Sequence, residues 1–376
     1  MAEPVSVEPQ LAENPAPVPG RLMSLDALRG FDMFWIVGGA EFARAVAKAI
    51  DAGWGEWVMQ RTEHPRWNGY EPWDQIFPLF MFIVGVAVPY SLTRRMERGE
   101  SRSALYWRVI RRGLMLVFLG MIFNGLLLLD FANQRYPSVL GRIGLTYMFA
   151  TLIAMNVRVR GLIVSTVSIL IGYWAIMKFV PVPGYGAGDW TPGHTLCGYL
   201  DRLLLPGVLY EKVRDPEGIL STLPAIATVL TGILAGHWLR RTDVSGQKKA
   251  AGLAVAGVVG VVLGKLLDPV FPINKNLWTS SFVLFTSGWS ALLLSVFYLV
   301  IDVWQYRRWA FFFVVIGMNA ITIYMLCEFV DFQGIFDVVF ARASDKVHPA
   351  LLASGEVLTG WALLYWMYCR KIFLKV

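Results

Sequence analysis

The sequence predicts an all-α membrane protein that crosses the bilayer with about ten helices and keeps both termini in the cytoplasm. Charged residues make up 16% of the chain, against about 25% in ordinary globular proteins. Hydrophobic residues make up 56%, and the mean hydropathy is +0.52. Because one soluble core cannot bury this much apolar surface, we expect lipid to solvate the middle of the chain.

Apolar runs of about 20 residues support this prediction, because a helix that rises 1.5 Å per residue needs that length to cross about 30 Å of hydrocarbon. The runs are too long for strands and lack the alternation of a membrane β-barrel. The seventh run is short and rich in glycine, so hydropathy alone supports it least. The predicted spans are residues 22–47, 73–92, 113–130, 139–156, 161–181, 218–239, 251–267, 279–302, 310–330 and 350–369.

Lys and Arg residues are distributed unevenly between alternate loops. Nineteen belong to one set, formed by Arg21, four loops and the C-terminal tail, and nine belong to the other set. Since cytoplasmic loops carry the excess of Lys and Arg, we expect the first set to face the cytoplasm. The alternation requires all ten spans, and it predicts a multi-pass protein of the cytoplasmic (inner) membrane whose large outer loops are 49–72 and 182–217.

Composition also sets the domain organisation and excludes some partners. Residues 1–20 contain five prolines and lack the apolar run of a signal peptide, so we expect a disordered tail before one transmembrane domain at 21–376. The three cysteines are widely spaced and form no Cys/His ligand pattern, so we expect neither a disulfide framework nor a metal. The net charge of +7 matches membrane orientation, and we expect no nucleic-acid partner.

Ionisable residues at membrane depth are costly, and each is therefore a candidate for function. Most of those in the predicted spans can pair with a residue three positions along the same helix or reach the water at a helix end. Asp74, Arg142 and Glu328 are harder to explain in this way. Because each lies in the outer half of a predicted span, we expect them to converge on one cavity.

His64 lies in an outer loop that is dense in aromatic and hydrogen-bonding residues and leads directly into a membrane helix. Spacing alone supports a catalytic role and a structural role equally. Asp74 begins the next helix and is a candidate to orient one ring nitrogen of His64, as the carboxylate of a catalytic triad does. The alternative is that Asp74 caps the helix by accepting hydrogen bonds from its free amides.

Ten short motifs that follow one another from residue 24 to the C-terminal tail give the chain a family resemblance. They are residues 24–30 (SLDALRG), 64–69 (HPRWNG), 74–85 (DQIFPLFMFIVG), 140–147 (LGRIGLTY), 181–184 (PVPG), 198–202 (GYLDR), 215–220 (DPEGIL), 271–278 (FPINKNLW), 317–319 (GMN) and 370–375 (RKIFLK). In these motifs and their order the chain resembles the heparan-alpha-glucosaminide N-acetyltransferase family, including its bacterial members, which are transmembrane acyltransferases.

The resemblance implies transfer of an acetyl group from cytosolic acetyl-CoA to the amine of a glucosamine-type sugar on the far side of the membrane. It implies that His64, in the H-x-x-W-N-G motif, is the catalytic residue. The chain departs from the animal enzyme in two spans. In the first span the animal enzyme has an asparagine with a role in the site, and in this chain that role is either vacant or taken by Glu41. In the ninth span Cys327 and Glu328 stand where the family has a His-Glu pair. These departures concern the acceptor more than the reaction.

The candidate site residues follow from these motifs and from the charges in the spans. His64 and Asp74 are the catalytic candidates. The substrate-binding candidates are Trp67, Asn68, Glu41, Arg142, Asn274, Lys275, Trp278, Asn319 and Glu328. The candidates that bind the phosphates of acetyl-CoA are Arg29, Arg94, Arg95 and Arg111.

Several alternatives remain open at this stage. His64 either accepts the acetyl group itself or removes a proton from the acceptor while both substrates are bound. Arg142 either binds substrate or pairs with Glu328 or Asp74, and Trp67 and Trp278 either stack on a sugar or belong to the interfacial belt. A transporter of amino sugars or cell-wall fragments is the alternative function, since ten helices with buried charges also suit one. The family resemblance makes a homodimer plausible.

Overall fold

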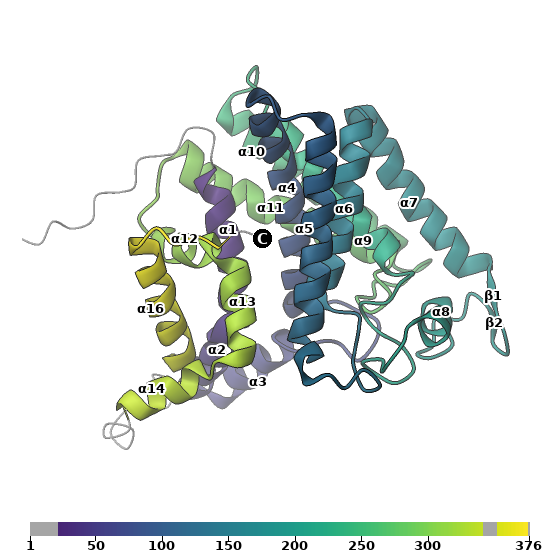
Figure 1. Cartoon of the computed structure of the whole chain (residues 1–376), viewed down its shortest axis with the longest axis horizontal. Helices are drawn as coiled ribbons and strands as arrows, with labels where there is room; N and C mark the ends of the chain where they lie inside the picture. Colours follow the sequence, from purple (N-terminus) through teal and green to yellow (C-terminus); the bar gives the residue numbers. More distant parts are fainter. Residues whose placement is uncertain (1–21, 341–351, 375–376) are drawn as a thin grey trace, which may run out of the picture.

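The computed structural model describes residues 22–340 and 352–374, and these residues are mostly helical (Figure 1). Two short strands, β1 and β2, pair in an antiparallel hairpin beside α7. The helices are α1 (Met23–Phe34), η1 (Trp35–Gly39), α2 (Ala40–Ile50), α3 (Ala52–Arg61), η2 (Pro72–Gln75), α4 (Ile76–Glu97), α5 (Arg102–Phe123), η3 (Leu126–Leu128), α6 (Val139–Asn156), α7 (Val159–Phe179), α8 (Leu196–Leu204), α9 (Thr222–Leu239), α10 (Gly246–Leu267), α11 (Ser280–Phe297), η4 (Tyr298–Val303), α12 (Phe311–Met318), α13 (Ala320–Phe329), α14 (Phe332–Phe340) and α16 (Gly355–Cys369), and the strands are β1 (Pro181–Val182) and β2 (Gly186–Ala187).

Six helical segments among the described residues are long and apolar enough to cross a membrane, and the bent pair α12–α13 would make a seventh. The prediction of an all-α membrane protein is confirmed at this level, but the count of ten spans is not, and the side on which the termini lie stays a prediction. The six are Pro72–Glu97, Val139–Asn156, Val159–Phe179, Thr222–Leu239, Gly246–Leu267 and Ser280–Val303.

Each remaining predicted span has an identifiable departure. The chain kinks inside the first, where Gly38 takes a φ of +84°. The third falls on the second half of α5, which ends at Phe123 and carries four arginines nearer its start. The ninth bends by 73° between α12 and α13. The predicted tenth span starts at residue 350, which lies outside the described residues, and α16 has only 15 residues.

The glycine-rich seventh span forms a regular 22-residue helix, α10, with a mean hydropathy of 2.1 over its most apolar window. Its glycines do not break the helix, and three of them, Gly257, Gly260 and Gly264, lie against α11, where a Cβ on Gly257 would come within 2.8 Å of the carbonyl oxygen of Gly288. Small residues at such contacts let membrane helices approach closely. The helix that forms therefore agrees with the alternation of the charged loops, which requires a span here.

Close backbone contact also joins the helices that frame the site. A Cβ on Gly85 of α4 would lie 2.2 Å from the carbonyl oxygen of Val229 in α9. A Cβ on Gly232 would lie 2.1 Å from the carbonyl oxygen of Phe82. Because no side chain separates them, α4 and α9 form a rigid pair at the centre of the bundle.

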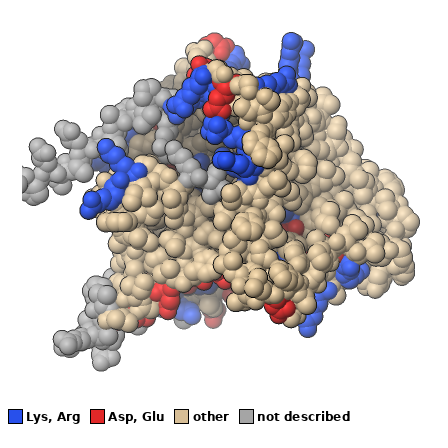
Figure 2. All heavy atoms as spheres, in the orientation of Figure 1, with Lys and Arg blue, Asp and Glu red and all other residues tan. Residues whose placement is uncertain are grey.

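The surface divides into a broad apolar belt and two charged ends (Figure 2). Lys and Arg are the more numerous charges at the end where α4 meets α5, with some acids among them, and both acids and bases mark the opposite end. At that opposite end lie α3, α8 and the β-hairpin. The segment between α3 and η2 carries His64 to this end.

Candidate functional site

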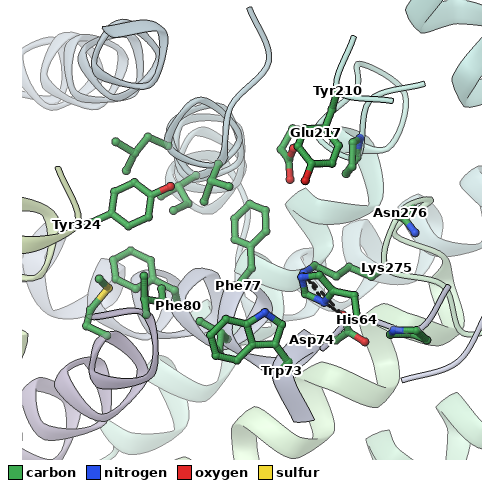
Figure 3. Close-up of a pocket in the computed structure, with 18 of the residues that line it drawn as sticks. His64, Trp73, Asp74, Phe77, Phe80, Tyr210, Glu217, Lys275, Asn276 and Tyr324 are labelled. Atoms are coloured by element: carbon green, nitrogen blue, oxygen red, sulfur yellow. Dashed lines mark hydrogen bonds and ion pairs between the residues drawn. The ribbon is translucent and has the colours of Figure 1, made fainter. Parts of the chain in front are cut away.

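Three residues form a hydrogen-bonded cluster on the wall of a cavity (Figure 3). His64 Nδ1 lies 2.6 Å from Asp74 Oδ1, and Lys275 Nζ lies 3.0 Å from His64 Nε2. Lys275 Nζ is also 3.6 Å from Asp74 Oδ1. The Asp74 side chain is fully buried, whereas that of His64 is 49% exposed. Lys275 Nζ also lies 3.4 Å from His64 Nδ1, so it faces the ring beside both nitrogens and does not occupy the lone pair of Nε2. The carboxylate of Asp74 beside Nδ1 favours the tautomer that carries its proton on Nδ1.

Asp74 makes both of the contacts that the sequence left as alternatives. It occupies the third position of η2, where its Oδ2 accepts a hydrogen bond from the backbone N–H of Glu71 at 3.0 Å. The Glu71 side chain completes this capping box and accepts two bonds from Arg61, at 2.9 and 2.7 Å. Because one oxygen is held by the backbone, the other is fixed toward His64.

Two loops, 62–71 and 268–279, bring His64 and Lys275 together. The backbone N–H of Gly69 donates to the carbonyl oxygen of Ile273 at 2.8 Å, and Gly69 takes a φ of +119° that favours glycine. Asn274 Nδ2 donates to Asn68 Oδ1 at 3.0 Å. Asn68 and Asn274 do not line the cavity, so their position favours a role in joining the loops rather than the predicted contact with substrate.

Burial lowers the pKa of Lys275, and the negative charge of Asp74 opposes this effect. The Lys275 side chain is only 19% exposed. An ammonium group with little contact with solvent is a strong hydrogen-bond donor. Lys275 is therefore placed to interact with negative charge that develops next to His64.

The cavity has a volume of about 440 Å³ and changes character along its length. The end near His64 is polar and is lined by Trp67 and Trp73, and the ring centroid of Trp73 lies 6.4 Å from that of His64. The other end is apolar, with side chains from α1, η1, α4, α6 and α13. These are Met33, Ile36, Phe80, Ile143, Ala320, Ile321 and Tyr324.

The two predicted aromatic residues differ in position. Trp67 lines the cavity, donates through Nε1 to the carbonyl oxygen of Trp190 at 2.7 Å, and lies 4.3 Å below the guanidinium carbon of Arg214. Trp278 is 1% exposed, and its Nε1 donates to Thr228 at 3.1 Å. Trp278 is thus neither a sugar platform nor an interfacial belt residue, because helices surround its ring on all sides.

Arg142 does not pair with Glu328 or Asp74 as the sequence suggested. It is buried at the start of α6, where it donates to Ser221 and to the carbonyl oxygen of Gly218, the latter at 3.2 Å. Its guanidinium carbon lies 5.1 Å over the ring of Trp278. Arg142 does not line the cavity, and its hydrogen bonds to Gly218 and Ser221 hold the loop before α9 in place.

The remaining substrate-binding candidates also lie outside this cavity. Glu41 is exposed on α2 and pairs with Arg44 at 3.5 Å, and Glu328 is exposed near the end of α13. Asn319 is buried at the bend between α12 and α13, where its Nδ2 donates to the carbonyl oxygen of Ile372 at 3.0 Å. The expected convergence of Glu328 with Asp74 and Arg142 is therefore wrong.

The arginines proposed for the phosphates lie toward the opposite end of the bundle from His64. Arg94 and Arg95 are in the last turns of α4, roughly 30 Å along that helix from its start. Arg95 pairs with Glu100 at 2.9 Å, and Arg111 is in the first half of α5. Arg29 on α1 contacts Asp26 Oδ1 at 3.5 Å and the carbonyl oxygen of Gly317 at 3.4 Å.

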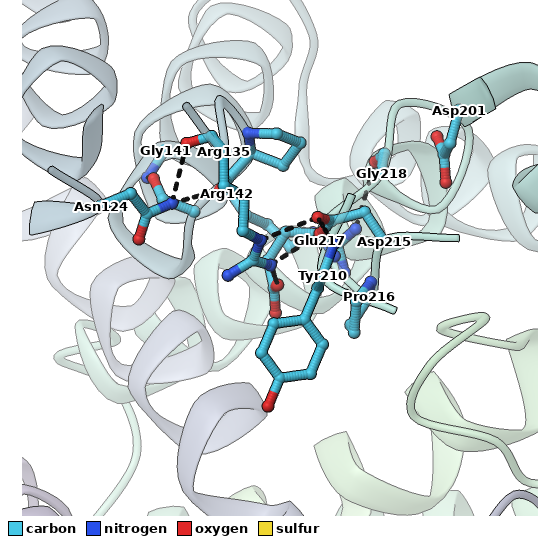
Figure 4. Close-up of polar contacts among 12 residues, drawn as sticks. Asn124, Arg135, Gly141, Arg142, Asp201, Tyr210, Asp215, Pro216, Glu217 and Gly218 are labelled. Carbon is cyan, nitrogen blue, oxygen red and sulfur yellow. Dashed lines mark hydrogen bonds and ion pairs between the residues drawn. The ribbon is translucent and has the colours of Figure 1, made fainter. Parts of the chain in front are cut away.

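A second polar cluster on the cavity wall was not predicted (Figure 4). Arg135 donates to both oxygens of Asp215, at 2.8 and 2.7 Å, and also to Glu217. Tyr210 lies 4.8 Å from the guanidinium carbon of Arg135. The 215–218 motif was a sequence signal for this cluster, but Arg135 lies 80 residues before it and stood out only as a loop charge.

No group of three or more potential metal ligands occurs in the part of the chain that the structure describes. The cluster at His64 contains one imidazole, one carboxylate and one amine. A protonated amine has no lone pair to offer a metal. The residues brought together here suit acid–base and acyl-transfer chemistry instead.

Comparison with known proteins indicates the same family as the sequence motifs do. The heparan-alpha-glucosaminide N-acetyltransferase catalytic family matches residues 21–267. The heparan-alpha-glucosaminide N-acetyltransferase of Homo sapiens is 29% identical over 96% of this chain and 60% of its own length, and that of Mus musculus is 29% identical over 100% and 63%. The chain thus spans under two thirds of the length of these relatives. It belongs to the heparan-alpha-glucosaminide N-acetyltransferase catalytic family.

Proposed function

We propose that this protein transfers an acetyl group from acetyl-CoA to the amine of a glucosamine-type sugar, with His64 as the catalytic residue. The observation that carries the proposal is the contact between His64 and the fully buried Asp74 on the wall of a cavity. A carboxylate on Nδ1 fixes the tautomer in which Nε2 holds the reactive lone pair. Membership of an N-acetyltransferase family supports the choice of acetyl transfer.

In the proposed reaction the C–S bond of the thioester breaks and a C–N bond forms. The acceptor ammonium loses two protons as its nitrogen becomes an amide: one reaches the CoA thiolate by way of His64, and the other leaves to the solvent. Two orders of events are open: direct attack by the amine while both substrates are bound, or an acetyl-imidazole intermediate. Asp74 supports both, because it stabilises the imidazolium and orients the ring.

Lys275 is the candidate to stabilise the oxyanion that forms when the thioester carbonyl is attacked. Its Nζ already lies 3.0 Å from Nε2, so an acyl group that reaches His64 also reaches Lys275. Fixed donors in a site that excludes water stabilise developing charge strongly. Among the residues proposed for this task, Arg142 and Asn274 are held in contacts outside the cavity.

We propose that acetyl-CoA approaches from the cytoplasmic end. The apolar end of the cavity, away from His64, suits the pantetheine arm of the donor. Met33 of α1 lines the cavity and stands four positions after Arg29, so the two residues share one face of α1. This face leads from the cavity toward the basic end of the bundle, where the nucleotide phosphates would bind.

Sealed vesicles that contain the purified protein test both the reaction and its sidedness. Acetyl-CoA is supplied on one side and glucosamine on the other, in both arrangements, and N-acetylglucosamine and free CoA are measured. We expect product in one arrangement only, with none in protein-free vesicles. Uptake of glucosamine without any acetyl donor would instead favour the transporter, and product only when both substrates share a side would contradict the proposed route.

A further inference from the structure

The wall of the cavity opposite the His64 cluster carries a second charged group that the proposed chemistry does not use. Figure 3 shows Glu217 and Tyr210 together on one wall, across the cavity from His64 and Lys275. Arg135 lines the same wall and pairs with Glu217. The cavity therefore has two polar walls with the apolar ring of Phe77 between them.

The conformation of this wall is fixed by Asp215, whose side chain is fully buried. Asp215 accepts two bonds from Arg135, one from the backbone N–H of Tyr210 at 3.1 Å and one from that of Glu217 at 3.0 Å. Both oxygens of Asp215 are therefore occupied. A group held by this many contacts is pre-organised for binding and needs little ordering when a ligand arrives.

Glu217 differs from Asp215 in having acceptor capacity left over. Its Oε2 accepts from Arg135, and the described residues make no hydrogen bond to its Oε1. The Glu217 side chain is 9% exposed, and the residue lines the cavity. A carboxylate oxygen with free lone pairs on a cavity wall is a site for a hydroxyl or an N–H of a ligand.

Charge favours a hydroxyl as the partner of Glu217. Arg135 already neutralises much of the charge of Glu217. Burial lowers the pKa of Arg135, but its bonds to Asp215 and Glu217 raise this pKa by more, so the guanidinium stays charged. The amine of the acceptor must lie at the other wall to react with His64. Tyr210, whose ring covers Arg135, adds an apolar face beside the carboxylate.

We propose that Glu217 binds a ring hydroxyl of the acceptor sugar and so selects amino sugars over other amines. This inference rests on the proposed function, because it takes a glucosamine-type sugar as the acceptor. A ring held at Glu217 by a hydroxyl presents its amine to His64 across the cavity. Arg135 and Asp215 act as positioning residues that hold the carboxylate.

The test measures binding of glucosamine without requiring catalysis, by the tryptophan fluorescence of the purified full-length chain, since Trp67 and Trp73 line the cavity. The variants are Glu217→Gln, Glu217→Asp and the matched control Glu56→Gln, which changes an exposed acid on α3. Because hydrogen bonds to charged groups are the stronger ones, we expect Glu217→Gln to weaken binding about 10- to 100-fold. Glu56→Gln should bind as wild type does.

Deoxy analogues of glucosamine identify the group that Glu217 binds. Wild type should lose most of its affinity for one of the 3-, 4- and 6-deoxy compounds, and Glu217→Gln should no longer distinguish that compound from glucosamine. Glu217→Asp keeps the charge and its pairing with Arg135, so a weakened but selective site is expected even where Glu217→Gln folds poorly.

Three results would overturn the proposal: unchanged glucosamine binding in Glu217→Gln, an equal loss of affinity for every deoxy analogue, or no binding of glucosamine by wild type. The proposed function fails separately. Wild type that binds glucosamine through Glu217 and yet releases no CoA would sink the acetyl transfer and leave the recognition site standing.

Discussion

Two histidines in loops contact a carboxylate in the same way, but the surroundings of the two contacts differ. His64 Nδ1 lies 2.6 Å from Asp74, and His194 Nδ1 lies 2.9 Å from Asp189. The side chain of Asp74 is fully buried, whereas that of Asp189 is 31% exposed. His64 lines the cavity and His194 does not.

The second ring nitrogen completes the difference. His64 Nε2 faces Lys275 at 3.0 Å. The ring of His194 is stacked on Tyr185, with 3.9 Å between the ring centroids. A carboxylate on Nδ1 is therefore common to a structural pair and to a candidate catalytic pair. What separates the two is the burial of the acid, a cavity that reaches the ring and a nearby cation.

Replacing each histidine should give the largest contrast. We expect His64→Ala to lower the turnover of acetyl-CoA with glucosamine by roughly 10³-fold, because acid–base and nucleophilic roles are both lost. His194→Ala should leave turnover within about twofold, as surface changes away from a site usually do. Free CoA is measured with a thiol reagent. Equal losses in the two variants would show that neither the cavity nor the buried acid distinguishes them.

Replacing the two acids should give the next largest contrast. Asp74→Asn removes the charge that fixes the His64 tautomer, and we expect kcat to fall by roughly 10²- to 10³-fold. Asp189→Asn should leave kcat unchanged. Since Asp74 also completes a capping box, thermal unfolding is measured for both variants. A folded Asp74→Asn protein with full kcat would contradict the orienting role.

Lys275 has no counterpart beside His194, so its removal tests what the cation adds. Lys275→Met should lower kcat by roughly 10²-fold, the effect of losing one oxyanion donor. Burial lowers the pKa of Lys275, so wild type should lose its ammonium, and with it activity, at a pH below that expected for a solvated lysine. This alkaline decline should be absent from the Lys275→Met profile; its persistence there would assign it to another group.

The clamp between the two loops should have a smaller effect on activity and a measurable one on stability. Asn68→Ala leaves the buried Nδ2 of Asn274 without its partner. We expect unfolding to become easier by about 1–3 kcal/mol, the cost of an unsatisfied buried group. Activity should fall several-fold as His64 and Lys275 lose their spacing. Wild-type stability in Asn68→Ala would mean that other contacts fix the loops.

The smallest effect concerns the stability of the exposed pair. Hydrogen bonds from Thr191, and then from His194, lower the pKa of Asp189 to about 2. Because this folded-state pKa lies below the unfolded value, the pair stabilises the fold above about pH 4 and loses that contribution as pH falls toward 2. Asp189→Asn should therefore lower Tm slightly at pH 6 and not near pH 2. A difference that stays constant with pH would contradict the ionic origin.

The sequence predicted the local part of the site better than its long-range part. His64 and Asp74 are ten residues apart, and the sequence offered their contact as one of two alternatives for Asp74, the other being a helix cap. Lys275 was assigned to substrate, and the structure places it 211 residues away in sequence but beside His64. Hydropathy does not encode which loops meet, so such contacts depend on packing alone.

The same reason explains the errors among the buried charges. Arg142 was expected to meet another ionised group in its own half of the membrane, but a serine hydroxyl and a backbone carbonyl satisfy part of it. Glu217 was visible only as part of a motif, because its partner Arg135 comes from a loop before α6. A charge at membrane depth indicates a partner without naming it.

The central claim is that an acetyl group moves from acetyl-CoA to a sugar amine at His64. Its most direct test follows labelled acetyl-CoA and glucosamine with purified wild type and His64→Ala, and identifies the products by mass. The account predicts labelled N-acetylglucosamine and free CoA in a one-to-one ratio with wild type, and neither above background with His64→Ala. Labelled product from folded His64→Ala at the wild-type rate would contradict it.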